Sequence, residues 1–245
     1  MDIWTVFWRD WRVLNRRKGK FLLSRMITPV LYIITFGWGL GRGMQVGGAS
    51  YLEFLIPGIM ALNAMNISFN AVGSSLNIGR LYHKTLEEYL TAPISSFSYV
   101  MGKVLAGTLQ GLVSSTVILV LAYGFGAHVT ISSWFLLALV LNCLVFAAMG
   151  FVAAMLIDAH EDMANFSTYV LVPMSFLCGT FFALDAIPKA FQILLQLLPL
   201  THASHALRVL GSGGAVPWLA LGVLFTYALV LIIWGVWSME RVRRQ

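Results

Sequence analysis

The chain has 245 residues, of which 59% are hydrophobic and only 11% are charged, and its formal net charge is +6. A soluble domain usually carries about 25% charged residues, so this composition excludes an ordinary soluble protein and favours a membrane protein. The basic excess is therefore read as Lys and Arg beside the cytoplasmic ends of membrane spans, and not as a nucleic-acid surface. Cys143 and Cys178 lie in apolar runs and are expected to be unpaired.

The first segment, residues 1–20, predicts an amphipathic helix that lies at the membrane interface. Its apolar side is an aromatic stripe at helical spacing, formed by Trp4, Phe7, Trp8 and Trp11. Arg9, Arg12 and Arg16 lie largely off that stripe, as in helices that rest among lipid head groups. A simple basic anchor before the first span is the alternative, and a cleaved signal peptide is disfavoured because the basic region is long and aromatic.

Windows without Asp, Glu, Lys or Arg predict six membrane-spanning helices, since about 20 apolar helical residues cross the hydrocarbon core. Helices are chosen over a closed barrel because period-two alternation is absent. The expected spans are 21–41, 54–78, 99–123, 132–157, 163–184 and 216–238. They form one transmembrane domain, residues 21–238, which is followed by a basic tail, residues 239–245. The predicted fold class is an all-α membrane protein.

The second expected span carries a polar stripe on one helical face, at steps of three and four residues. The stripe consists of Asn63, Asn66, Asn70, Ser74 and Asn77. Two interpretations remain open for it. The side chains could hydrogen-bond to neighbouring helices of the bundle or of a dimer. Alternatively, part of the stripe could line a path for a polar head group.

The stretch before the last span is apolar but is not expected to cross the membrane, because Pro199 divides it into two short pieces. We expect two short helices that re-enter from the external side. Its turn and polar residues are Pro188, Pro199, Thr201, His202, His205 and Arg208. A structural or interfacial role of the His and Arg side chains is favoured over contact with a solute. No metal site is expected there or in the acidic loop 158–162.

The distribution of basic residues predicts the orientation of the chain. Thirteen of the 16 Lys and Arg residues lie in the N-terminal segment, in the connection after the second span and in the tail. Arg42, Lys189 and Arg208 lie on the opposite side. With six spans, the positive-inside rule places both termini in the cytoplasm.

Two features that the sequence lacks reduce the range of possible functions. No expected span has an ionisable residue near its centre, which disfavours a carrier driven by an ion or proton gradient. The chain also lacks the G-x-x-x-x-G-K-[ST] phosphate loop, so any use of ATP belongs to another polypeptide.

Three segments carry a resemblance to a known family. They are "YLEFLIPGIMALN" (51–63), "HKTLEEYLTAPISSFSYVMGKVL" (83–105) and "CGTFFALDAIPKAFQILLQLLPLTHASHALRVL" (178–210). In their order and spacing, over nearly the whole chain, they resemble the membrane subunit of ABC-2 type transporters. The resemblance is to the branch that includes the nodulation-factor and daunorubicin exporter permeases.

The resemblance implies a permease subunit of the bacterial inner membrane that exports a lipid-like, glycolipid or amphipathic drug-like solute. The implied partners are two copies of an ABC ATPase subunit, a second permease copy and membrane lipids, with no nucleic acid. ATP and Mg would bind to the ATPase subunit, and this chain would hold no cofactor and be no enzyme by itself. The alternatives are a sensing, resistance or membrane-extraction subunit without net export and, less favoured, a gradient-driven carrier.

The resemblance also implies a cytoplasmic coupling helix, because the stretch after the second span is similar to the family pattern T-L-E-x-L-x-x-P-I. In the family this helix docks into a groove of the ATPase. The residues carried over are Lys84, Thr85, Leu86, Glu87, Glu88, Tyr89, Leu90 and Pro93. Leu86 and Leu90 are expected to dock, Glu87 and Glu88 to make polar contacts, and Pro93 to break the helix. Tyr89 departs from the pattern by adding an aromatic residue before Leu90.

Overall fold

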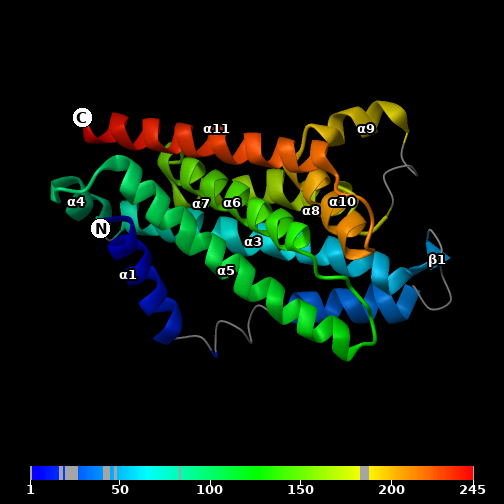
Figure 1. The fold of residues 1–245 in the computed structure, drawn as a ribbon. Helices are drawn as coiled ribbons and strands as arrows, with labels where there is room; N and C mark the ends of the chain where they lie inside the picture. Colours follow the sequence, from blue (N-terminus) through cyan, green and yellow to red (C-terminus); the bar gives the residue numbers. More distant parts are fainter. Residues whose placement is uncertain are drawn as a thin grey trace.

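The computed structural model describes residues 2–16, 19, 27–40, 45–46, 49–82, 84–182 and 188–244. The long helices run side by side as an elongated bundle (Figure 1). The short helix α4 (Thr85–Thr91), the start of α1 (Asp2–Arg16) and the end of α11 (Trp218–Arg243) lie at one end, called the α4 end below. The opposite end is called the α10 end, after the helix α10 (Pro199–Gly211).

Four helices of the described chain are long and apolar enough to cross a membrane. They are α3 (Tyr51–Leu81), α5 (Ser96–Gly124), α6 (Ser133–Leu156) and α11. They coincide with the second, third, fourth and sixth expected spans. The expected all-α membrane fold is confirmed, and the remaining strands are a two-residue pair, β1 (Gln45–Val46) and β2 (Ala49–Ser50).

The first and fifth expected spans are shorter helices with π-helical turns. The first is helical over residues 27–40 and includes η1 (Ile33–Leu40), while residues 21–26 lie outside the described chain. The fifth is built from α7 (His160–Phe166), η2 (Ser167–Leu171) and α8 (Val172–Leu177). The π-helical turn ends two residues before Pro173, whose missing N–H disturbs regular helical bonding.

The fifth helix ends at Leu177, short of the expected residue 184. Its end is explained by Gly179, which has a φ of +74° that other residues rarely adopt. Residues 183–184 lie outside the described chain. The count of six spans therefore stays a prediction.

Buried apolar residues form two clusters, both of which include α3. The larger cluster joins α3 to α6, α10 and α11. The smaller one, called the α4-end cluster, draws residues from α1, α3, α4, α5, α6 and α11: Val6, Val72, Leu76, Leu86, Tyr99, Val100, Val104, Ala147, Ala148, Phe151, Ala154, Met155 and Met239. Helix α6 packs closely against α3 at Gly150. A Cβ added to Gly150 would lie 2.5 Å from the carbonyl oxygen of Phe69, so the two backbones are too close for a larger residue there.

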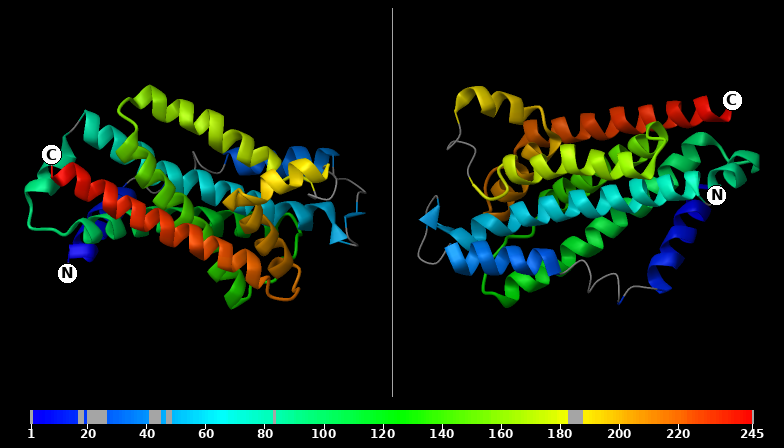
Figure 2. Two further views of the ribbon diagram at one scale, coloured as in Figure 1. Left: turned by 90° about the horizontal axis from the view of Figure 1, so that it is seen from above. Right: turned by 180° about the vertical axis from the view of Figure 1, so that it is seen from behind.

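Two features stand apart from the long helices. Helix α1 runs at a steep angle to them beside the α4 end, as both Figure 1 and the rear view in Figure 2 show. The expected pair of short helices is found as α9 (Lys189–Gln196) and α10, and the chain divides at Pro199 in the first turn of α10. The α10 side chains Leu200, Ala203 and Leu207 are fully buried, whereas Phe191, Ile193 and Leu194 of α9 are exposed.

Candidate functional site: a coupling surface and a solute groove

Helix α4 begins in a tight turn after α3. Lys84 precedes it in a left-handed conformation with a φ of 51°, which lets the chain reverse direction over very few residues. The Thr85 hydroxyl then donates a hydrogen bond of 3.2 Å to the carbonyl oxygen of Gly79. The start of α4 is therefore bonded directly to the last turns of α3.

The end of α4 is set by Pro93. The residue before a proline disfavours helical angles, and Ala92 is accordingly extended, with φ −74° and ψ 150°. Helix α5 starts directly afterwards, where the Ser95 hydroxyl accepts a hydrogen bond of 3.2 Å from the backbone N–H of Ser98. The predicted short helix broken at Pro93 is thus present, and short turns join it to α3 and α5.

The two faces of α4 have different surroundings. Leu86 is only 4% exposed and belongs to the α4-end cluster. Burial of a Leu side chain stabilises a fold by about 1.5–3 kcal/mol, so Leu86 anchors α4 to its own chain. The expected docking of Leu86 to an ATPase stays a prediction. Glu87 and Glu88 are exposed on the outer face, and the side chain of Leu90 lies outside the described set.

Tyr89 connects α4 to α1 and α5. Its hydroxyl accepts a hydrogen bond from the guanidinium of Arg9, whose Cζ also lies 5.3 Å from the centre of the Tyr89 ring. This hydrogen bond raises the pKa of Arg9. The Tyr89 ring lies 4.5 Å from that of Tyr99 on α5. The residue that departs from the family pattern is therefore the one that links three helices.

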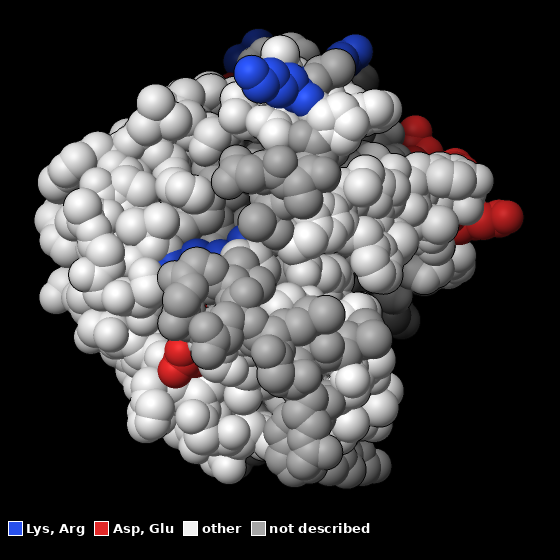
Figure 3. All heavy atoms as spheres, turned by 90° about the vertical axis from the view of Figure 1, so that its right-hand side faces the viewer, with Lys and Arg blue, Asp and Glu red and all other residues white. Residues whose placement is uncertain are grey.

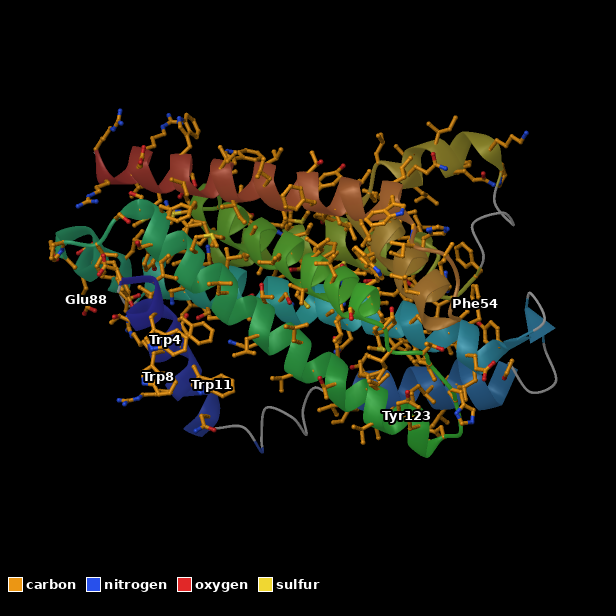
Figure 4. The ribbon with its side chains drawn as sticks, in the orientation of Figure 1. Trp4, Trp8, Trp11, Phe54, Glu88 and Tyr123 are labelled. Carbon is orange, nitrogen blue, oxygen red and sulfur yellow. The ribbon has the colours of Figure 1, made fainter. Side chains whose placement is uncertain are left out.

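Helix α1 is fastened to α5 by one face. The Lys103 ammonium lies 2.8 Å from the Asp10 carboxylate, and their side chains are only 13% and 22% exposed. One turn earlier on α1, Val6 packs directly against Gly102 of α5. A Cβ added to Gly102 would lie only 2.7 Å from the Val6 Cβ, which is too close for two carbon atoms. The expected aromatic stripe lies on another face, with Trp4 64% and Trp8 39% exposed, and its tryptophans follow one another along α1 (Figure 4).

A second fastening joins the loop after α6 to α3. Arg80 donates hydrogen bonds of 3.1 and 2.9 Å to the carbonyl oxygens of Ala154 and Met155 and forms an ion pair with Asp158. These carbonyls belong to the last turn of α6, where helical partners are missing. Sequence reasoning missed this contact, because Arg80 and Asp158 are 78 positions apart along the chain.

Asn77 extends this fastening. Its amide donates a 3.0 Å hydrogen bond to the carbonyl oxygen of Ile157, and its Oδ1 lies 3.2 Å from Nδ1 of His160. At the other end of the polar stripe, the Asn63 amide donates a 2.7 Å hydrogen bond to the Ser114 hydroxyl of α5. Both ends of the stripe are buried and hold neighbouring segments together.

The middle of the stripe has different partners. The amides of Asn66 and Asn70 donate to the carbonyl oxygens of Leu62 and Asn66, and the Ser74 hydroxyl donates to Oδ1 of Asn70. All of these bonds lie within α3, and the three side chains are half-buried. The stripe is therefore divided into buried structural ends and a middle that faces the edge of the bundle.

A groove of about 460 Å³ lies between the helix 27–40 and α3. It is lined by Thr28, Pro29, Tyr32, Ile59, Leu62, Asn63, Asn66 and Ile67. Apolar side chains and two Asn amides thus share one concave surface, which suits a molecule with an apolar and a polar part. Tyr32 also contacts Phe181, with ring centres 5.3 Å apart.

The polar residues of the short helix pair tie its two helices together. The Thr201 hydroxyl donates a 2.6 Å hydrogen bond to the carbonyl oxygen of Leu195. Nε2 of His202 donates a 2.7 Å hydrogen bond to the carbonyl oxygen of Gln196. Pro188 directly precedes α9, while His205 is exposed. In the described part of the chain, no group of three His, Cys, Asp or Glu side chains is placed to hold a metal ion.

Arg208 joins α10 to two other segments. Its Nε and Nη2 donate hydrogen bonds of 3.0 and 2.8 Å to the carbonyl oxygens of Phe54 and Thr180. Its Cζ lies 3.8 Å from the centre of the Phe54 ring, which Figure 4 shows on α3 at the α10 end. The expected coupling residues of α4 and the polar residues of the short helix pair therefore lie at opposite ends of the bundle. The polar stripe lies along α3 between them.

Comparisons with known proteins agree with the family resemblance seen in the sequence. The sequence model of the family described as "ABC-2 type transporter" matches residues 1–210. The inner membrane transport permease YadH of Escherichia coli (strain K12) is 28% identical over 221 residues, which cover 87% of this chain and 86% of that protein. Nodulation protein J of Rhizobium meliloti (strain 1021) is 30% identical over 235 residues, which cover 93% of this chain and 88% of that protein. The protein of the same name from Rhizobium leguminosarum bv. viciae is 30% identical over 236 residues, which cover 93% of this chain and 90% of that protein.

Proposed function

Since this chain belongs to the ABC-2 type transporter family and is the membrane subunit of an ABC transporter, we propose that it couples ATP hydrolysis by a partner ATPase to export of an amphipathic solute. The solute is lipid-like, glycolipid or drug-like. ATP and Mg bind to the partner, because this chain has no phosphate loop. The observation that carries the proposal is α4, a short helix with an exposed acidic face and an anchored inner face.

The anchoring of α4 suits it to pass on a movement. A push on Glu87 and Glu88 reaches α5 through Leu86 and the α4-end cluster. It reaches α1 through the contact of Tyr89 with Arg9. Because packed elements move as units, a docked ATPase that shifts α4 would shift the ends of α1, α3 and α5 with it.

The solute class is supported by the groove beside α3. Its apolar wall suits an acyl or aromatic part, and the half-buried amide of Asn66 offers hydrogen bonds to a polar part. The relatives named as a transport permease and as nodulation protein J are consistent with transport but give no solute for this chain.

The proposed assembly contains two copies of this chain and two copies of the ATPase in the bacterial inner membrane. The α4 end faces the cytoplasm together with both termini. Described basic residues support this orientation, since Arg80, Lys84 and Arg241 lie at that end, whereas the short helix pair carries only Lys189 and Arg208 among its described residues. The exposed apolar side of α11 suits lipid or the second copy.

The coupling assignment is tested by replacing Glu87 and Glu88 together with Ala. We expect copurification of the cognate ATPase and ATP turnover of the complex to fall at least about tenfold, since charged hydrogen bonds contribute about 1.5–3 kcal/mol each. The control is Glu161→Ala with Asp162→Ala, which removes two exposed acidic residues from the first turn of α7. Unchanged binding and turnover in the α4 variant would contradict the proposal.

A further inference from the structure

We propose that Arg208 binds the anionic head group of the transported molecule, so that the solute is an amphiphile with a phosphate or carboxylate at one end. This inference rests on the proposed transport of an amphipathic solute and narrows it to a chemical class. It assigns Arg208 a role beyond the structural one expected from the sequence.

The charge of Arg208 is bonded to neutral groups. A guanidinium has five N–H donors, and the two hydrogen bonds that Arg208 makes to described residues go to uncharged carbonyl oxygens. No salt bridge joins it to a carboxylate among the residues that the structure describes. The Phe54 ring at 3.8 Å compensates part of the charge. Among the described residues, a positive charge with donors to spare is therefore held in place.

The backbone around Arg208 leaves room for its guanidinium. A Cβ on Gly58 would lie 2.7 Å from Nη2 of Arg208 and 2.6 Å from the carbonyl oxygen of Thr180. Only glycine lets the guanidinium lie this close to α3 while it bonds to Thr180. The hydrogen bonds fix one edge of the planar group, which favours paired bonds to a phosphate or carboxylate at the remaining edge.

Access to Arg208 is open from the α10 end. Arg208 is partly exposed. Figure 3 looks onto the α10 end, where basic atoms are visible below the surrounding surface and acidic atoms lie nearby. A head group can therefore reach Arg208 from this end of the molecule. Lys189, the other described basic residue of the short helix pair, is exposed at the start of α9, and none of the Arg208 contacts named above involves it.

An aromatic surface lies beside Arg208. The rings of Tyr51 and Phe54 lie 6.1 Å apart, and the Tyr51 hydroxyl donates a 2.9 Å hydrogen bond to the carbonyl oxygen of Phe181. The Phe181 ring also contacts Tyr32, which lines the groove along α3. Apolar contacts thus continue from the groove to Phe181, next to the Thr180 carbonyl that holds Arg208. This continuity suits a molecule with an apolar tail and an anionic head.

The experiment uses this chain in complex with its ATPase in phosphatidylcholine nanodiscs. Binding of radiolabelled dodecyl phosphate is measured, with dodecyl maltoside and inorganic phosphate as competitors and empty nanodiscs subtracted. We expect saturable binding that dodecyl maltoside and inorganic phosphate displace at least about tenfold less well than unlabelled dodecyl phosphate. Equal displacement by dodecyl maltoside would contradict the anionic head, and equal displacement by inorganic phosphate would contradict the amphiphile.

The variants locate the site. Arg208→Gln should weaken binding about tenfold or more, since it removes a charge-assisted pair, whereas Arg208→Lys should stay within a few-fold of the wild type. Gly58→Ala keeps every charge but displaces the guanidinium, and it should also weaken binding. Lys189→Gln is the matched control and should bind normally. Binding by Arg208→Gln at the wild-type affinity would overturn the proposal.

A second measurement needs no variant and remains valid if Arg208→Gln fails to fold. Phenylglyoxal modifies arginine, and mass spectrometry follows Arg208 together with the exposed Arg244 as an internal control. Dodecyl phosphate should protect Arg208 and leave Arg244 reactive. Lack of protection, or an Arg208 that never reacts, would contradict an accessible site. Parallel ATP turnover separates the two proposals: coupled turnover without anion preference refutes this inference alone, and anion binding without coupling refutes the transport function.

Discussion

At the scale of single residues, Tyr89 decides how α4 is held. Its ring packs on Tyr99, and its hydroxyl accepts the Arg9 hydrogen bond. An aromatic residue between Glu88 and Leu90 adds length to the family pattern, and the structure uses that residue for contacts within the chain. Leu86 shows the same lesson, since an apolar residue on a short helix can serve its own core as well as a partner.

Tyr89→Phe is expected to keep the ring contact and remove the hydrogen bond to Arg9. The loss should be about 1 kcal/mol, which would appear as faster hydrogen exchange in α1 and lower coupling of ATP turnover to transport. Combining it with Arg9→Gln should add little to either single change, because both remove the same bond. Fully additive effects would show that the bond does not connect the two helices.

At the scale of elements, α1 is part of the bundle as well as a candidate surface helix. Its Val6 and Asp10 face packs on α5, and its tryptophans face away from that contact. These two faces let the same helix rest in the head-group region and follow movements of α5. The face that packs on α5 could not be assigned from the sequence, because Gly102 and Lys103 are far from α1 along the chain.

Gly102→Ala is expected to push α1 from α5, since the new Cβ would lie 2.7 Å from the Val6 Cβ. Overpacking of this kind costs about 1–3 kcal/mol, and thermal unfolding of the purified protein should report it. The matched control is Gly124→Ala at the end of the same helix, where a Cβ would meet nothing within 4 Å. Equal melting temperatures for the two variants would contradict the tight α1 contact.

At the scale of the whole molecule, the bundle separates two tasks. Residues proposed to meet the ATPase lie at the α4 end, and those proposed to meet the solute lie along α3 and at the α10 end (Figure 1). Helix α3 runs between them, and Arg80 and Arg208 fasten regions near its two ends to α6 and α10. A displacement at one end of α3 is therefore connected by packed contacts to the other end.

The proposed orientation predicts opposite labelling of two exposed lysine positions. Lys84→Cys, at the α4 end, should react with a membrane-impermeant maleimide only after the cytoplasmic side is opened. Lys189→Cys, beside the α10 end, should react in intact cells with a permeable outer membrane. The native Cys143 and Cys178 are buried and should contribute little background. Labelling of Lys84→Cys from outside would reverse the topology.

The sequence by itself determined the membrane class, four of the spans, the short helix ended by Pro93 and the division of the last loop at Pro199. These features follow from local hydropathy and from the missing N–H of proline, which act over a few neighbouring residues. The family was also visible in three short segments.

Only the tertiary structure decided which way these elements face. It turned Leu86 inward, split the Asn and Ser stripe into buried ends and a half-buried middle, and brought Arg9 to Tyr89, Arg80 to the end of α6 and Arg208 to Phe54. Each of these contacts joins residues that are distant along the chain or depends on how a helix is rotated against its neighbours. Close packing selects that rotation from the shapes of all the facing side chains, and no local pattern records it.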